Sequence, residues 1–151
     1  MREKLKLLLG RLSMPGRVEQ SAESVADVRL ATAVLLFEVA KMDRSIDQQE
    51  RQLIPELLQR HYGFDDDSLR ALSAEAEQVA DAAISYHPFT RELKSCLTLQ
   101  QRVMVIEQMW AVAFVDGQLD MHEEHLIRKV ADLLYVPHKE FIACKHRARA
   151  G

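Results

Sequence analysis

Cysteine, glycine and long apolar runs are all scarce in this sequence of 151 residues. The two cysteines, Cys96 and Cys144, have neither C-x-x-C nor zinc-finger spacing, which argues against a disulfide framework or structural zinc and suits a reducing compartment. The five glycines form no glycine-rich phosphate loop. No apolar run approaches the roughly 20 residues that a membrane-spanning helix needs. The sequence therefore predicts a cytoplasmic chain without a transmembrane helix or a nucleotide loop.

The signatures of common metal-dependent and nucleophilic enzymes are also missing. None of the six histidines follows a glutamate by three residues, as the ligand pairs of a di-iron bundle require. His122 and His125 lack the His-Glu-x-x-His spacing of zinc hydrolases, and we interpret them as solvent-exposed helix residues. Cys144 and His146 are expected on diverging sides of a helix, which does not suit a nucleophile and its base. We therefore predict that the protein is not an enzyme and identify no small-molecule substrate.

Charge is divided unevenly along the chain, although the net charge is only −3. Residues 1–20 and 138–151 each carry +3, and the stretch between them carries −9. An acidic body with basic ends is a poor surface for duplex nucleic acid and a better one for a cation or a basic protein partner. We therefore expect a protein partner and no nucleic acid.

The first residues form a basic amphipathic segment. Leucines recur on one helical face, basic side chains surround them, and Pro15 and Gly16 then break the pattern. The favoured interpretation is a terminal helix that packs on its own domain or frays. The alternative is a helix that docks on a membrane protein or on the inner membrane surface. In that interpretation the docking residues are Lys4, Lys6, Leu8 and Arg11.

From about residue 21 onward, apolar residues recur at three- and four-residue steps, which predicts helices throughout. Pro55 predicts a kink or an early break in the second helix, and the basic tail HRARAG is expected to fray. No segment alternates as a strand would, so the predicted fold class is all-α, with two helix-turn-helix halves that share one core. The expected helices span about 21–42, 47–63, 65–84, 89–97, 98–115, 120–134 and 137 onward.

One stretch of the chain occurs twice. Residues 34–54 and 107–127 align without a gap and share seven of 21 positions, where unrelated residues would share about one or two. Phe37 and Trp110 occupy matched positions and are predicted to belong to the core. The shared pairs are Val39/Val112, Ala40/Ala113, Asp43/Asp116, Asp47/Asp120, Glu50/Glu123, Leu53/Leu126 and Ile54/Ile127.

Three of the shared residues are carboxylates in the spacing D-x3-D-x2-E. A standard calcium loop is excluded, because Val112 and Phe114 occupy the first and third ligand positions of the second copy. One copy alone would make a weak site for a hard cation, since Ca²⁺ takes about 6–8 oxygens, whereas two copies folded together would offer six carboxylates. Oxygen ligands of this kind favour Ca²⁺ or Mg²⁺ over Zn²⁺. The candidate ligands are Asp43, Asp47, Glu50, Asp116, Asp120 and Glu123.

The same carboxylates also have a structural interpretation. Asp47 and Asp120 are good helix N-caps, and Glu50 and Glu123 stand at the position that completes a capping box. Capping alone therefore explains these four acidic residues, and turn chemistry is the favoured interpretation over cation binding.

Capping does not explain the first carboxylate of each copy. Asp43 and Asp116 stand near the carboxyl end of a helix, where a negative charge is unfavourable. The second copy has Gly117 in its turn, whereas the first has Arg44, which adds a positive charge. If only one copy binds a cation, we expect it to be the second.

At these residues the chain resembles the TerB-like family, the helical domain associated with tellurite resistance in bacteria. The resemblance covers about residues 25–147 and implies a compact bundle of about seven helices built from two similar halves. It also implies an acidic patch, proposed metal binding, and work beside membrane proteins in metal- and stress-response systems. It rests on A-x2-D-G-x-[IL]-x3-E and a degenerate first copy, which are Ala113, Asp116, Gly117, Leu119 and Glu123, and Ala40, Asp43, Ile46 and Glu50.

Two functions from different classes stay open. The first is a non-catalytic interaction module whose acidic turns bind a divalent cation or a basic partner. The second is a purely structural helical adaptor without a metal site, in which the amino-terminal helix docks. Both divide the chain into an amino-terminal segment over 1–20, a helical domain over 21–147 and a tail over 148–151.

Overall fold

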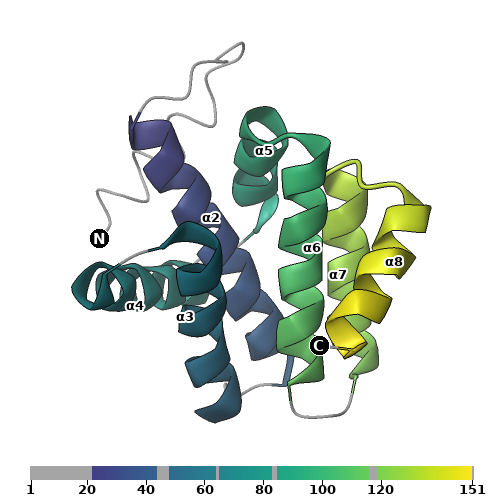
Figure 1. Cartoon of the computed structure of the whole chain (residues 1–151), viewed down its shortest axis with the longest axis horizontal. Helices are drawn as coiled ribbons and strands as arrows, with labels where there is room; N and C mark the ends of the chain where they lie inside the picture. Colours follow the sequence, from purple (N-terminus) through teal and green to yellow (C-terminus); the bar gives the residue numbers. More distant parts are fainter. Residues whose placement is uncertain (1–21, 44–47, 64, 83–84, 116–118, 151) are drawn as a thin grey trace.

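The computed structural model describes residues 22–43, 48–63, 65–82, 85–115 and 119–150, and Figure 1 shows their arrangement. These residues form seven α-helices and one short 3-10 helix, and none of them lies in a strand. The all-α prediction is therefore confirmed. The elements are α2 (Ala22–Ala40), η1 (Lys41–Asp43), α3 (Gln48–Tyr62), α4 (Asp66–Ala82), α5 (His87–Cys96), α6 (Leu99–Phe114), α7 (Met121–Leu133) and α8 (His138–Ala150).

Helices α2 and α6 form the centre of the molecule. From Val28 to Ala40, α2 is buried on almost every side, and only Arg29 and Glu38 keep partial exposure. A helix that is apolar all round in this way must be covered by neighbours. Helix α4 and helix α5 pack most closely on α2, while α8 packs along α6 and the two central helices also contact each other. Phe37 and Trp110 are both buried, as predicted.

The sequence repeat is visible in the packing. Helix α4 lies along α2 as α8 lies along α6, and α2 contacts α7 as α6 contacts α3. Figure 1 shows α3 and α4 on one side of the two central helices and α7 and α8 on the other. The short helix α5 packs against α2 and α7 and so bridges the halves. Two similar units therefore share one core, as the repeat predicts.

Several helix ends are set by local side-chain chemistry. The Thr98 hydroxyl accepts from the Gln101 backbone N–H at 3.2 Å, and the Gln101 side chain accepts from the Thr98 N–H at 2.9 Å, which makes a capping box. Asp65 Oδ1 accepts from the Ser68 N–H at 2.7 Å at the start of α4. Helix α3 ends where Gly63 adopts a φ of 68°, a conformation that suits glycine. These ends agree with the sequence-based expectations.

Three details differ from expectation. Helix α3 continues through Pro55 to Tyr62 without an early break, because buried residues on both sides of the proline hold it against the core. Helix α5 begins at His87, since Pro88 is favourable in a first turn. The basic tail is helical through Ala150, because Arg147 Nε lies 2.6 Å from Glu107 Oε1 of α6. The expectation that the tail frays was therefore wrong.

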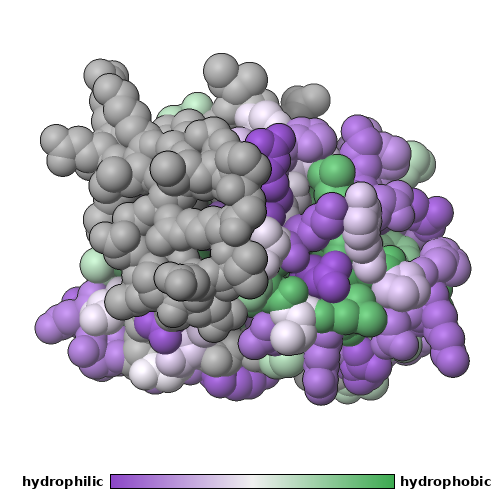
Figure 2. All heavy atoms as spheres, turned by 90° about the horizontal axis from the view of Figure 1, so that it is seen from above, coloured by the Kyte–Doolittle hydropathy of each residue, from purple (hydrophilic) through white to green (hydrophobic). Residues whose placement is uncertain are grey.

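The surface of the bundle mixes polar and apolar side chains. Viewed from above, hydrophobic areas are interrupted by hydrophilic side chains across the described part of this face (Figure 2). No helix in the described ranges combines the length and the apolar character that crossing a membrane requires.

Candidate functional site

The two acidic turns of the repeat follow equivalent helix ends. Helix α2 passes into η1, which ends at Asp43, and α3 begins at Gln48. In the second copy, α6 ends at Phe114 and α7 begins at Met121, the position that matches Gln48. In Figure 1 these four described ends lie at the same lower end of the bundle. The fold therefore brings both copies of the acidic motif to one end of the molecule.

The amino terminus of α7 shows how the second copy is built. Asp120 has the extended backbone of an N-cap, with φ −79° and ψ 141°, and its Oδ1 accepts from the His122 backbone N–H at 2.7 Å. Glu123 Oε1 accepts from the Asp120 N–H at 3.3 Å, so the capping box is complete. The predicted caps at Asp120 and Glu123 are confirmed, and His122 and His125 are exposed as expected.

Glu123 of this capping box and Glu50, its counterpart in the first copy, are both buried far more deeply than capping requires. Glu123 is 1% exposed and Glu50, its counterpart in the first copy, is 2% exposed. Removing an ionised carboxylate from water costs several kcal/mol unless hydrogen bonds or positive charge compensate it. The sequence carried a signal for this burial, because each glutamate stands three and four residues before two apolar residues that face the core. The matched burial makes these two carboxylates the centre of the candidate site.

The remaining candidate ligands are only partly placed. Asp47 and Asp116 lie outside the described residues, and Asp43 ends η1 without a described side chain. Within the described ranges, no three histidine, cysteine, aspartate or glutamate side chains are grouped so as to hold a metal ion. The proposed docking residues also lie outside these ranges; they are Lys4, Lys6, Leu8 and Arg11. Cation binding and docking therefore remain predictions.

The two copies differ in charge beside their turns. Lys41 occupies the first copy, where its ammonium group donates to the Ala80 carbonyl at 2.8 Å and lies 3.5 Å from Glu38 and 3.7 Å from Asp81. Burial raises the pKa of Glu38, and the Lys41 charge opposes that rise. Phe114 stands at the matching position of the second copy and carries no charge. At this pair of matched positions, only the first copy therefore carries a positive charge.

Helix α8 adds positive charge to the outer side of the second copy. Lys145 lies 3.3 Å from Glu124, the residue after the buried glutamate, and Arg128 lies 3.9 Å from the same carboxylate. Glu124 is therefore neutralised by its neighbours and is not available as a strong cation ligand.

Sequence reasoning missed a second feature, a groove between α3, α6 and α8. Arginines from α3 and α8 border it, and the side chain of Gln108 lines it from α6. A single amide inside the apolar stripe of α6, between Val105 and Val112, was the only sequence signal that pointed there.

Fold and site together define a class of protein: an all-helical bundle of two repeated units, with acidic residues at the equivalent turns. A family model described as tellurite resistance protein TerB matches residues 29–146. The chain belongs to this family, and the resemblance seen in its duplicated motif is confirmed. No curated protein and no solved structure matches the chain.

Proposed function

We propose that this protein is a non-catalytic TerB module whose acidic turns bind a divalent cation, Ca²⁺ or Mg²⁺ in preference to Zn²⁺, or a basic segment of a protein partner. The observation that carries the proposal is the matched burial of Glu50 and Glu123 in the first turns of α3 and α7. A capping box by itself needs no such burial, because its hydrogen bonds form equally well at a helix surface.

Hard cations give a physical reason for deep carboxylates next to acidic turns. Ca²⁺ and Mg²⁺ take oxygen ligands from carboxylates, backbone carbonyls and water. A bound cation would also offset the repulsion among the acidic side chains. The second copy is the stronger candidate, because its turn carries Gly117 and follows Phe114, whereas the first copy has Arg44 and Lys41.

A location and a partner accompany this proposal. The module works in the cytoplasm, either within a metal- or stress-response system or within a system associated with the inner membrane. Lys4, Lys6, Leu8 and Arg11 dock the basic amino-terminal segment on a membrane protein.

A specific observation favours the alternative, a purely structural helical adaptor. Asp120 and Glu123 already satisfy each other's helix-terminal backbone groups in the capping box of α7. In this alternative the carboxylates order the turns, no cation binds, and the amino-terminal segment alone recruits the partner.

Thermal melts of chelator-stripped protein, titrated with Ca²⁺, Mg²⁺, Mn²⁺ and Zn²⁺, distinguish the two functions. We expect a saturable rise in melting temperature with Ca²⁺ or Mg²⁺, equivalent to about 2.7 kcal/mol at a hundredfold excess over the dissociation constant. The double variant Asp116→Asn, Glu123→Gln should lose the rise, because an amide oxygen still accepts the capping hydrogen bond but carries no charge.

Asp132→Asn, on the exposed face of α7, serves as the matched control and should keep the full response. Flat melts for all four ions would leave the structural adaptor as the function, whereas an equal response in the double variant would exclude the second acidic turn as the cation site.

A further inference from the structure

A groove of about 380 Å³ runs along α6, between α3 and α8. Its lining is largely apolar, and a second cavity of about 150 Å³ adjoins it at Met104 and Gln108. The α6 lining residues extend from Met104 to Phe114, which is about 15 Å of helix. This length matches roughly three turns of a second helix. The apolar lining residues are Leu53, Leu57, Met104, Ala111, Phe114, Val115 and Ala148.

The groove is positively charged within a chain of net charge −3. Arg60 borders it from α3, Arg147 and Arg149 border it from α8, and Glu107 is its one acidic lining residue. Arg147 Nε lies 2.6 Å from Glu107 Oε1, so that pair is internally neutralised. Within the described part of the chain, Arg60 and Arg149 make no ion pair, although the Arg149 guanidinium lies 5.3 Å from the Phe114 ring centroid. One positive charge from α3 and one from α8 therefore border the apolar lining without an ion-pair partner.

Gln108 is a second, independent feature that suits a ligand in the groove. Its side chain is only 4% exposed, lines both cavities, and its Oε1 finds no hydrogen-bond partner in the described part of the structure. Buried acceptors are nearly always paired, because an unpaired one forfeits its hydrogen bonds to water. A ligand that brings an N–H or O–H group into the groove would satisfy this oxygen.

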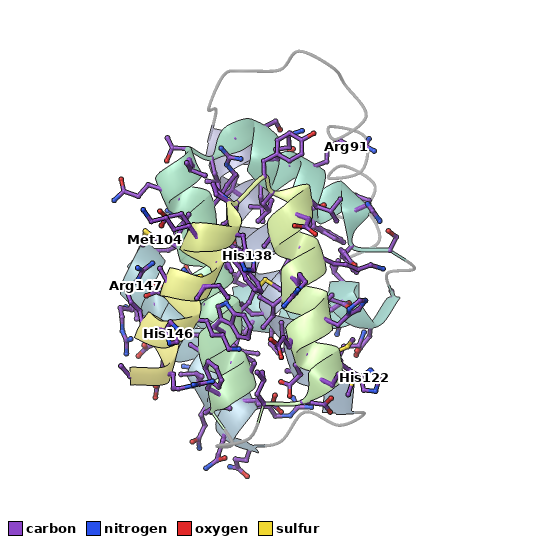
Figure 3. The ribbon with its side chains drawn as sticks, turned by 90° about the vertical axis from the view of Figure 1, so that its right-hand side faces the viewer. Arg91, Met104, His122, His138, His146 and Arg147 are labelled. Carbon is purple, nitrogen blue, oxygen red and sulfur yellow. The ribbon has the colours of Figure 1, made fainter. Side chains whose placement is uncertain are left out.

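We propose that this groove binds an acidic amphipathic helix of a partner protein. Apolar side chains of that helix pack against Met104 and the α3 leucines, carboxylates pair with Arg60 and Arg149, and a donor group reaches Gln108. Met104 is 41% exposed and has the flexible side chain that adapts to an incoming apolar surface. Figure 3 shows Met104 and Arg147 projecting from the same side of the molecule.

The unpaired acceptor favours a peptide over an anionic lipid. A fatty acyl carboxylate would satisfy the arginines and the apolar lining but carries no donor for Gln108, whereas a helical peptide can offer a hydroxyl or amide side chain. The groove would attract negatively charged ligands, whereas the acidic turns would attract positively charged ones. A failure of cation binding would therefore not contradict peptide binding in the groove.

Fluorescence anisotropy of the full chain with a labelled synthetic peptide tests the proposal. The probe is a helix of about 14 residues with leucine and one central serine along one face and glutamate beside it, and its partner probe has lysine in place of every glutamate. We expect saturable binding of the glutamate peptide and none of the lysine peptide. The double variant Arg60→Glu, Arg149→Glu should weaken binding by about tenfold or more, because like charges then face the peptide.

Arg91→Glu is the matched control, since this exposed arginine of α5 lies away from Arg147 in Figure 3. It should bind the glutamate peptide as the unaltered protein does. Gln108→Leu should weaken peptide binding and at the same time raise the melting temperature of the free protein, because it removes the unpaired acceptor. If Gln108 had only a structural role, its replacement would change the melting temperature without weakening peptide binding.

Three results would overturn the proposal. They are an absence of glutamate-peptide binding, an equal loss of affinity in Arg91→Glu, and binding to phosphatidylglycerol vesicles without binding to the peptide. The last result would assign the groove to an anionic lipid.

Discussion

Cys144 illustrates how burial changes the chemistry of a single side chain. It is fully buried between α8 and α6, and its thiol donates to the Phe141 carbonyl at 3.2 Å. Burial raises the pKa of the Cys144 thiol to about 11, and the nearby Glu107 carboxylate adds to the rise. The thiolate is the reactive form of cysteine, so the buried thiol should be inert at neutral pH.

This shift predicts a loss of stability in alkali. In the unfolded chain the thiol ionises near pH 9, whereas in the native protein it stays protonated up to about pH 11. Proton release therefore favours the unfolded state across this window, and the free energy of unfolding should fall by about 2 kcal/mol more than in Cys144→Ala. Urea denaturation at intervals from pH 8 to 11 measures the difference. Parallel curves for the two proteins would contradict the expected shift.

For Glu50 and Glu123, the sequence predicts the capping role but not the burial of the side chain. Their capping role follows from the local spacing of an aspartate and a glutamate, which sequence alone displays. Their burial depends on helices that lie far apart in the sequence, since α2 contacts α7 and α3 contacts α6. The spacing to the following leucine and isoleucine places each glutamate on the core face, although carboxylates are usually exposed.

The start of α6 allows the contribution of one capping box to be measured. Thr98 is exposed, so Thr98→Ala removes the cap without altering the core, and we expect the free energy of unfolding to fall by about 1 kcal/mol. Ser95→Ala is the control, because the Ser95 hydroxyl bonds back to carbonyls of its own helix, including that of Arg91, and caps nothing. Chemical denaturation of both variants gives the comparison. Equal losses would show that the hydroxyl acts in some way other than capping.

Local helix caps were easier to predict from the sequence than the full length and the packing of the helices. The caps at Thr98, Asp120 and Asp65 are local, and so is the glycine conformation that ends α3. The continuation of α8 to Ala150 depends on packing against α6, which no local pattern records. The groove beside it was missed for the same reason, because its arginines come from helices separated by most of the chain.

Because of the repeat, the overall architecture could be predicted from the sequence. Two copies with the same apolar positions must bury the same faces, so their first helices are expected to meet at the centre. Helices α2 and α6 do so, and α4 and α8 then cover them in equivalent ways. The sequence gives no comparable signal for α5, which belongs to neither copy and packs against one helix of each half.

A shared core predicts that the two halves unfold together. Trp110, the only tryptophan, lies in α6 and packs against Phe141 with ring centroids 5.2 Å apart, so its fluorescence reports the second half. Leu35→Ala removes a fully buried side chain from α2, in the first half, and should cost about 2–5 kcal/mol. If the core is single, this variant lowers the Trp110 fluorescence midpoint and the circular dichroism midpoint in urea by the same amount. Met121→Ala, at a side chain that is 78% exposed, should move neither midpoint appreciably. An unchanged Trp110 fluorescence midpoint in Leu35→Ala would mean that each half has its own core. That result would contradict the contacts of α2 with α6 and α7.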